Sequence, residues 1–200
     1  MPEHFEAGHA PLILASASPR RLDLLRQVGI EPAGVEPAEL DETPLRVELP
    51  AAHAMRLAQA KAERVAVRHP GSWVLAADTV VACGRRILPK AESEAEAREC
   101  LRLLSGRRHR VHGGIALAAP DGRLTARHVE TAVLFKRLTE TEVAWYLASG
   151  EWRGKAGAYA IQGCAALFVR GIVGSYSNVV GLALFESVAL LRGRGFPGLP

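Results

Sequence analysis

Cysteine, aromatic side chains and long apolar runs are all scarce in this chain of 200 residues. The three cysteines, Cys83, Cys100 and Cys164, lie far apart without a CxxC pair, which excludes a disulfide scaffold and a zinc knuckle. Aromatic residues make up 6% of the chain, so Ala, Leu and Val must supply most of the core. No apolar run approaches the roughly 20 residues that span a bilayer, and we therefore expect no transmembrane protein.

Charge of one sign is not abundant either. The 25 Lys and Arg residues against 21 Asp and Glu leave a formal net charge of +4, without the basic runs of a strong nucleic-acid binder. The 48% of hydrophobic residues can fill a core and argue against a disordered chain. The first ten residues lack the basic-then-apolar pattern of a secretory signal. We expect a tail at 1–10, a single domain at 11–200 and a cytoplasmic location.

Apolar periodicity and capping signals predict an α/β fold. The expected strands are 12–15, 73–83, 111–119, 124–136 and 165–173, and the expected helices run from Ser18 to Gly29, from Pro50 to about His69, from Ser93 to Gly106, from Thr139 to Gly150 and over 182–192. Asp121-Gly122 is typical of a hairpin turn between two strands. This order favours a mixed sheet with at least one antiparallel pairing over a pure βαβ repeat.

The segment Ser16-Ala17-Ser18-Pro19-Arg20-Arg21 falls where a strand turns into a helix. The start of a helix offers unpaired N–H groups and a partial positive charge, which suit phosphate. The serine hydroxyls and the planar guanidinium groups of Arg20 and Arg21 add donors that match phosphoryl oxygens. A well-capped helix with two solvated arginines explains the same pattern, and periodicity alone favours it slightly.

Asp78 and Lys61 place charges among apolar residues. A carboxylate inside the strand VLAADTVV is costly unless it ends the strand, is paired or holds a metal. A general base or a Mg²⁺ ligand is the functional interpretation of Asp78, and a strand-ending Asp bonded to Thr79 is the structural one. Lys61 follows Ala54 by seven residues on the apolar face of its helix, so it either extends past the core to solvent or points into a cleft.

The glycine-rich stretch from Gly154 to Gly163 predicts tight turns and close backbone approach. Gln162 carries an amide donor and acceptor in an apolar setting, enough to read the edge of a base, although a loop that merely packs is the alternative. Gly150 to Lys155 is not a P-loop, because the spacing is short and Ala156 stands where Ser or Thr is required.

Four segments resemble the Maf family of nucleoside triphosphate pyrophosphatases, in the family's order. They are LILASASPRRLDLL, then AELDETP with RLAQAKA, then VLAADTVV with LPKAESEAEARECLRLLSGRRHRV, and finally GKAGAYAIQGCAALFVRGIVGSYSNVVGLAL. The resemblance covers nearly everything from Leu12 to about Leu191. It implies the inosine triphosphatase-like (Maf/Ham1) fold, a mixed twisted sheet with flanking helices and two lobes around a cleft.

The resemblance also implies an activity. The protein would be a hydrolase acting on acid anhydrides, cleaving a nucleotide between its α and β phosphates to a nucleoside monophosphate and pyrophosphate. A divalent cation, Mg²⁺ or Mn²⁺, would be the cofactor, and a homodimer would be the usual assembly.

Site residues follow from the resemblance position by position. Asp78 matches the catalytic proton acceptor, and Ser16, Arg20, Arg21, Lys61 and Lys90 match phosphate-binding positions. Arg20, Thr79 and Gln162 match positions linked to base choice. Asp41 and Glu42 match an acidic pair that would hold metal together with Asp78, and an apparent one-residue insertion leaves open which of the pair is equivalent.

The substrate class rests on fewer residues. Arg20 directly after proline and the stretch Ala158 to Gln162 resemble the branch that acts on dTTP and UTP, or on modified pyrimidine nucleotides, with a house-cleaning role and a role in division arrest. Two alternatives remain open. One is the branch acting on 7-methyl-GTP and modified purines, and the other is a non-catalytic nucleic-acid or division-regulating binding protein.

Overall fold

A computed structural model describes residues 10–197 and 199, and the expected tail at 1–10 falls outside this range except for Ala10. The described chain forms one mixed sheet with the strand order β2-β1-β3-β5-β6-β7, and β4 pairs with β3 beside this path. The strands are β1 (Leu12–Ala15), β2 (Gly34–Val35), β3 (Trp73–Cys83), β4 (Arg86–Leu88), β5 (Arg108–Ala118), β6 (Leu124–Phe135) and β7 (Val169–Val173). The prediction of a mixed α/β fold is confirmed.

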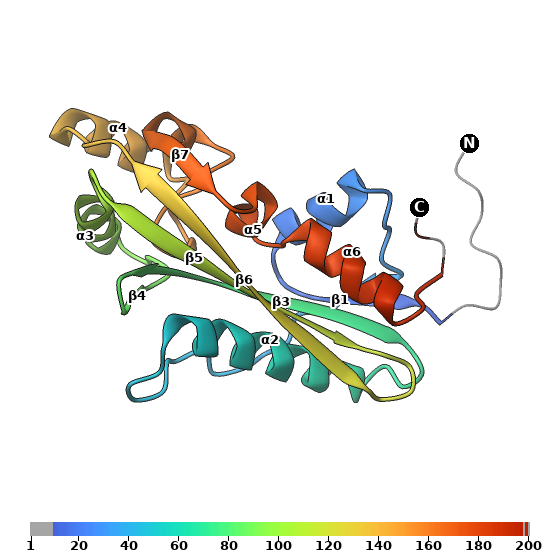
Figure 1. The fold of residues 1–200 in the computed structure, drawn as a ribbon. Helices are drawn as coiled ribbons and strands as arrows, with labels where there is room; N and C mark the ends of the chain where they lie inside the picture. Colours follow the sequence, from blue (N-terminus) through green and yellow to red (C-terminus); the bar gives the residue numbers. More distant parts are fainter. Residues whose placement is uncertain (1–9, 198, 200) are drawn as a thin grey trace.

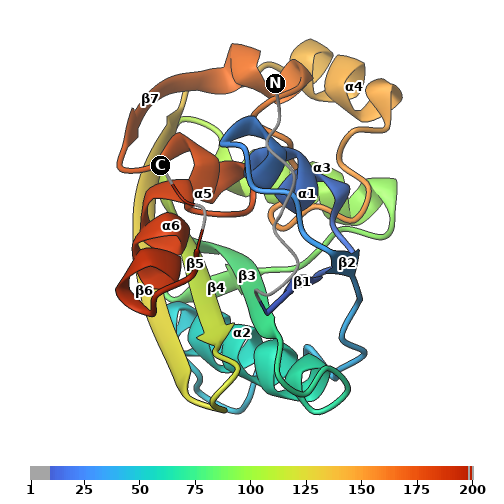
Figure 2. The same ribbon diagram turned by 90° about the vertical axis from the view of Figure 1, so that its right-hand side faces the viewer.

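Helices cover both faces of this sheet. They are α1 (Pro19–Gln27), α2 (Pro50–Ala66), α3 (Glu94–Leu104), α4 (Glu140–Ser149), α5 (Tyr176–Val180) and α6 (Leu184–Gly193), with a 3₁₀ helix η1 (Cys164–Phe168) before β7. Figure 1 shows α2 along one face of the long strands and α1, α5 and α6 on the opposite face. Turned by 90°, the ribbon keeps α2 below the sheet and the C-terminal helices beside β6 (Figure 2).

The hairpin of β5 and β6 forms the long antiparallel centre of the sheet. Between the two strands, Gly122 adopts a positive φ of 81°, and Asp121 Oδ1 accepts a hydrogen bond of 2.9 Å from the N–H of Arg123. Only glycine adopts this backbone region without steric cost. The predicted Asp121-Gly122 turn is therefore confirmed, and the positive φ of Gly122 explains why glycine occupies it.

Helix α2 packs on the sheet through small residues. Its predicted apolar stripe, Ala54, Leu57, Ala58, Ala62 and Val65, is buried against alanines of β3 and β5. The helix approaches so closely that a Cβ on Gly114 would lie 2.1 Å from the carbonyl oxygen of Ala54. Alanine and glycine at this contact bring the α2 backbone down onto the strands, and with it the polar side chain of Lys61.

Four elements differ from the sequence prediction. The strand expected at 165–173 begins only at Val169, because Cys164–Phe168 forms η1. In this segment Ala165 and Phe168 are buried while the two residues between them are exposed, which is the three-residue period of a 3₁₀ helix and not the alternation of a strand. The short elements β2, β4 and α5 were not predicted, since two, three and five residues are too few to show a period.

The sheet forks at β3, and this fork positions the site. Residues 73–76 of β3 pair with β1, and residues 81–83 pair with β4. Among the described residues, no strand pairs with 77–80 on that side, although β5 continues along the other. Because side chains alternate along a strand, Asp78 faces α2 and Thr79 faces α1 and α5.

Candidate active site

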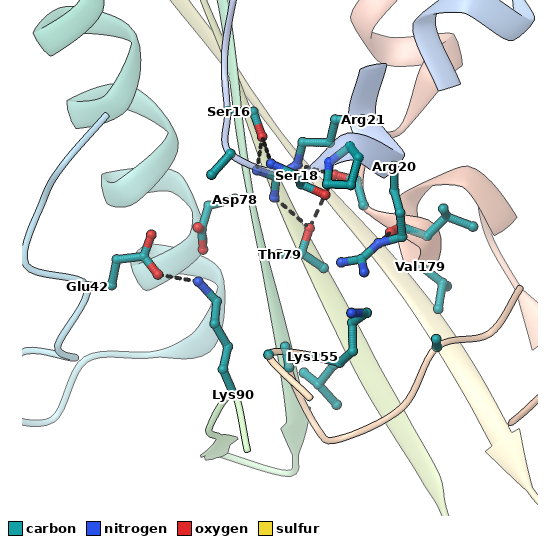
Figure 3. A pocket seen from close by; sticks show the side chains of 18 of the residues that line it. Ser16, Ser18, Arg20, Arg21, Glu42, Asp78, Thr79, Lys90, Lys155 and Val179 are labelled. Carbon is teal, nitrogen blue, oxygen red and sulfur yellow. Dashed lines mark hydrogen bonds and ion pairs between the residues drawn. The ribbon is translucent and has the colours of Figure 1, made fainter. Parts of the chain in front are cut away.

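A cavity of about 370 Å³ opens at the fork of β3. On one side it is bordered by the end of β1, the start of α1 and the end of α5, and on the other by the segment after β4 and the loop 153–162 (Figure 3). The volume lies in the range of small-molecule sites, roughly 300–1,000 Å³. The predicted residues that line it are Ser16, Arg20, Arg21, Glu42, Lys61, Asp78, Thr79, Lys90 and Gln162.

Asp41 is the one predicted site residue that does not line this cavity. Its side chain is exposed, and its Oδ1 accepts a hydrogen bond of 2.9 Å from the N–H of Thr43. Glu42 is the member of the acidic pair that turns inward. Of the two acidic residues, Glu42 alone lines the cavity.

Two carboxylates and two lysines form a connected chain across one wall of the cavity. Lys61 Nζ lies 2.7 Å from Asp78 Oδ1 and 2.5 Å from Glu42 Oε1, and Lys90 Nζ contacts Glu42 Oε2. Lys61 and Asp78 are 6% and 4% exposed. Burying an ion pair rarely adds stability over apolar residues of the same shape, so such a pair in an apolar layer favours a chemical role.

Glu42 titrates far below its usual range. Burial acts to raise its pKa, but hydrogen bonds from Lys61 and Lys90 outweigh burial and lower the pKa to about 2. The carboxylate is therefore ionised at neutral pH although it is half-buried. An ionised oxygen ligand of this kind is what a hard divalent cation prefers.

The opposite wall holds the two arginines. Arg21 donates from NH1 to Ser16 Oγ at 3.0 Å and from NH2 to Thr79 Oγ1 at 3.3 Å. Burial lowers the pKa of Arg21, and burial likewise lowers the pKa of Arg20. Among the described residues neither guanidinium pairs with a carboxylate, since the Nε atoms of both donate to backbone carbonyls. Neither arginine is therefore in direct contact with a carboxylate of the described residues, although the nearby charges of Asp78 and Glu42 act to raise the pKa of Arg21 against the effect of burial.

The start of α1 also faces the cavity. Ser18 has the extended backbone of a helix N-cap, with φ −87° and ψ 115°, but its hydroxyl caps no N–H group. Within residues 10–197, its buried Oγ has no hydrogen-bond partner. A buried hydroxyl without a partner costs free energy. At the positive end of α1 and beside two arginines, this hydroxyl is placed to bind an anion.

Sequence reasoning missed two cations of this cavity, Arg153 and Lys155. Figure 3 shows Lys155 pointing toward Arg20, and burial followed by the charge of Arg20 lowers the pKa of Lys155. The composition of the chain held a signal that could have identified Lys155 as a site residue. The chain has four lysines among 25 basic residues, and three of the four, Lys61, Lys90 and Lys155, line this cavity.

Backbone pairing fixes the loop that carries Lys155. An isolated antiparallel bridge joins Lys90 to Ala156, and the N–H of Gly157 donates to the carbonyl of Pro89 at 3.1 Å. A Cβ on Gly157 would lie 2.7 Å from Val81, so only glycine fits here. These contacts therefore hold the backbone that carries Lys155 beside the backbone that carries Lys90, at one rim of the cavity.

Gln162 lies at the exposed end of the same loop. An aromatic cluster supports this region: Tyr146 Oη accepts from the N–H of Ala160 at 3.1 Å, and Tyr159, which lines the cavity, contacts His109 through its hydroxyl at 2.9 Å. These contacts fix the backbone next to Gln162, whose exposed side chain lies at the lining of the cavity.

The charges of the cavity define what it can bind. Its lining contains six basic and two acidic side chains, an excess of four positive charges. Unpaired N–H groups, guanidinium groups and ammonium groups are all donors that phosphate oxygens accept from. The fold and the site together define an α/β protein with a small-molecule cavity built for a polyanion.

The chain belongs to the Maf family: the family described as Maf-like protein matches residues 11–194. A dTTP/UTP pyrophosphatase of Paramagnetospirillum magneticum is 71% identical over 187 residues, covering 94% of this chain and 98% of that protein. A dTTP/UTP pyrophosphatase of Rhodospirillum rubrum is 64% identical over 189 residues, covering 94% of this chain and 90% of that protein. The resemblance found in the sequence is therefore confirmed.

The fold is similar to that of a solved HAM1 protein from Coxiella burnetii, with a TM-score of 0.50 and 16% identity over 92% of this chain and 99% of that one. At this identity the likeness shows the fold alone, and it confirms the expected Maf/Ham1 relationship. None of the described helices combines the length and the hydropathy that a membrane span needs.

Proposed function

We propose that this protein is a nucleoside triphosphate pyrophosphatase that hydrolyses the α–β phosphate bond of dTTP and UTP. The observation that carries the proposal is convergence: Ser16 and Arg21, Lys61, Asp78, and Lys90 come from four separate segments of the chain and line one cavity. The names of the relatives that are 71% and 64% identical support the same activity.

The phosphate chain would lie along the basic lining. A fully ionised nucleoside triphosphate carries about four negative charges, which the positive excess of the cavity balances. The unpaired hydroxyl of Ser18, at the positive end of α1, would donate to a phosphate oxygen. Arg21, Lys90 and Lys155 approach from the remaining sides.

Asp78 is the proposed proton acceptor. Lys61 binds its Oδ1 at 2.7 Å, which leaves the second oxygen to orient a water molecule and take its proton. The water oxygen forms a bond to the α-phosphorus as the bond to the bridging oxygen breaks, and pyrophosphate departs. Positioning and charge neutralisation supply most of the rate acceleration in such reactions.

A divalent cation fits the residues present. Mg²⁺ commonly takes one or two protein carboxylates and completes its shell with phosphate oxygens and waters. Glu42, ionised with a pKa of about 2, and Asp78 supply those two carboxylates, and no group of three or more acidic, His or Cys ligands occurs in the described residues. Bound there with the nucleotide, the cation would neutralise phosphate charge.

We assign the selection of the nucleotide base to residues at the rim of the cavity. The edge of thymine or uracil presents acceptor, donor and acceptor groups, and the amide of Gln162 complements a donor–acceptor pair of them. Arg20 and Thr79 line the same cavity and complete the proposed specificity set. The printed names of the two relatives, both dTTP/UTP pyrophosphatases, favour this branch over the purine alternative.

A nucleotide panel tests the proposal. Purified protein with Mg²⁺ is expected to release pyrophosphate from dTTP and UTP, with 7-methyl-GTP, ATP and GTP as comparisons. Release from 7-methyl-GTP alone would assign the chain to the purine branch, and no release from any nucleotide would favour the binding protein. Chelation of the metal with EDTA is expected to abolish release, and added Mg²⁺ or Mn²⁺ to restore it.

The assembly and the location follow from the family resemblance. We propose a single domain over residues 11–200 that forms a homodimer in the cytoplasm. Light scattering coupled to gel filtration measures the assembly directly, and a mass of one chain would contradict it.

A further inference from the structure

Asn178 of α5 is a buried amide that does not line the cavity. It is 1% exposed, and its Nδ2 donates to the carbonyl of Val111 at 3.2 Å, to the carbonyl of Val129 at 3.4 Å and to Thr131 Oγ1 at 3.1 Å. One amide nitrogen thus bonds both central strands, β5 and β6. Buried polar groups of this kind are costly unless every partner is in place, so the contact fixes α5 on the sheet.

Space for this amide exists only because residue 113 is glycine. A Cβ on Gly113 would lie 1.9 Å from Asn178 Oδ1. Gly113 is also the register partner of Thr79 on β3. Asn178 therefore lies over Gly113, the residue of β5 that pairs with the cavity residue Thr79 of β3.

A second contact holds the start of α5. Thr131 Oγ1 accepts from the N–H of Ser175 at 3.1 Å and donates to its carbonyl at 3.2 Å. Ser175 Oγ in turn accepts from the N–H of Asn178 at 3.2 Å. The hydroxyl of Thr131 therefore forms hydrogen bonds with both Ser175 and Asn178.

The far end of α5 holds the two arginines of the cavity. The carbonyl of Val180 accepts from Arg20 Nε at 3.2 Å, and the carbonyl of Gly181 accepts from Arg21 Nε at 2.8 Å and from Thr79 Oγ1 at 3.3 Å. These carbonyls come two and three residues after Asn178. Any shift of α5 on the sheet therefore moves the acceptors that orient both guanidinium groups.

We infer that Asn178 is a positioning residue for substrate binding, which acts on phosphate through Arg20 and Arg21. An arginine side chain loses rotamer entropy when it is ordered, and a site that orders it before the ligand arrives binds more tightly. Asn178 orders the two arginine side chains in this way, although it lies outside the cavity. The inference rests on the proposed function, because it requires the arginines to contact phosphate.

Two single variants and their combination test this role. Asn178→Ala removes the amide, and Gly113→Ala displaces it by steric overlap. Each is expected to destabilise the protein, to raise the KM for dTTP about tenfold and to weaken binding of inorganic triphosphate, measured by calorimetry, by a similar factor.

The double variant separates positioning from stability. In Gly113→Ala/Asn178→Ala the new methyl group enters the space that the amide leaves, so the free energy of unfolding should recover relative to the sum of the single effects. A positioning role predicts that KM and the triphosphate Kd stay raised about tenfold. Return of both constants to wild-type values together with stability would overturn the inference.

Further variants guard against loss of folding and against indirect effects. Thr131→Val deletes the shared hydroxyl without opening a cavity and should raise both constants by a smaller factor. Thr139→Ala removes the cap of α4, away from the cavity, and should lower stability while KM stays at the wild-type value.

Wild-type protein that neither cleaves nucleotide nor binds triphosphate would refute the proposed function itself. Active wild type with unchanged constants in every variant would refute the role of Asn178 alone.

Discussion

Lysine is concentrated at the cavity of this protein, whereas arginine occurs both there and in surface ion pairs. Exposed pairs such as Arg26 with Glu31 and Arg86 with Glu99 use arginine, whereas three of the four lysines of the chain line the cavity. An ammonium group is compact, strongly hydrated and offers three donors, while a guanidinium group is planar and pairs readily at surfaces. Scarcity of lysine therefore carries information about the site that a local motif does not.

Lys155→Met tests this assignment at the residue scale. Among the described residues no carboxylate pairs with Lys155, whose Nζ donates to the carbonyl of Arg153 at 3.1 Å, so its charge remains for phosphate. We expect the KM for dTTP to rise about tenfold with a smaller change in kcat. Lys136→Met makes the same chemical change outside the cavity, and an equal rise in KM there would contradict the assignment.

Asp78→Asn tests the proton acceptor. The amide retains the shape of the side chain and an acceptor for Lys61, which also keeps its contact with Glu42. We therefore expect the fold to persist and kcat to fall at least about a hundredfold. Steady-state pyrophosphate release measures the rate, and circular dichroism controls for folding. Turnover near the wild-type level would remove Asp78 from the mechanism.

At the scale of elements, the fork of β3 does most to shape the site. Because β1 and β4 pair with different halves of β3, Asp78 and Thr79 lie at the opening between them and point to opposite faces. Asp78 then meets α2, and Thr79 meets α1 and the end of α5. One strand thus contributes two adjacent residues to two walls of one cavity.

Gly114→Ala tests the close contact of α2 with the sheet. The added Cβ would lie 2.1 Å from the carbonyl oxygen of Ala54, a backbone atom that cannot move without moving the helix. We expect a loss of about 3 kcal/mol of unfolding free energy in urea denaturation. Gly171→Ala in β7 meets no atom within 4 Å and should change stability by less than about 0.5 kcal/mol. Similar losses in both variants would contradict this account.

Two capping boxes predicted the starts of helices correctly, whereas one apolar run was assigned to the wrong element. Ser93 with Glu96 and Thr139 with Glu142 form the two expected capping boxes, and α3 and α4 begin directly after them. The apolar run 165–173 was wrongly predicted as one strand, because hydrophobicity alone does not distinguish a 3₁₀ turn from an extended chain. Side-chain capping is a specific local hydrogen bond, whereas burial is decided by the rest of the molecule.

For the whole molecule, the aromatic cluster under the cavity links stability to pH. His109 is 1% exposed, lies edge-on against Phe135 and Tyr159, and burial lowers its pKa to about 4. The folded state therefore holds His109 neutral, while the unfolded chain protonates it below about pH 6.5. Since the unfolded state binds more protons between these values, stability falls as pH decreases through this window.

His109→Gln is expected to remove this part of the pH dependence. Between pH 7 and pH 4 the wild type should lose about 3 kcal/mol more unfolding free energy than the variant does. Urea denaturation at a series of pH values measures the difference. Parallel curves for the two proteins would show that protonation of His109 does not contribute.

By itself, the sequence determined the class of fold, the main helices and strands, the family, and nine of the residues that line the cavity, because capping, alternation and motif order are local or linear properties. Tertiary structure alone decided the rest. It placed Glu42 inward and Asp41 outward, brought Lys155 to Arg20 (Figure 3), and set Asn178 over Gly113. These contacts join residues far apart in the chain, and they depend on the register of β3 and the packing of helices on both faces of the sheet, which no short segment encodes.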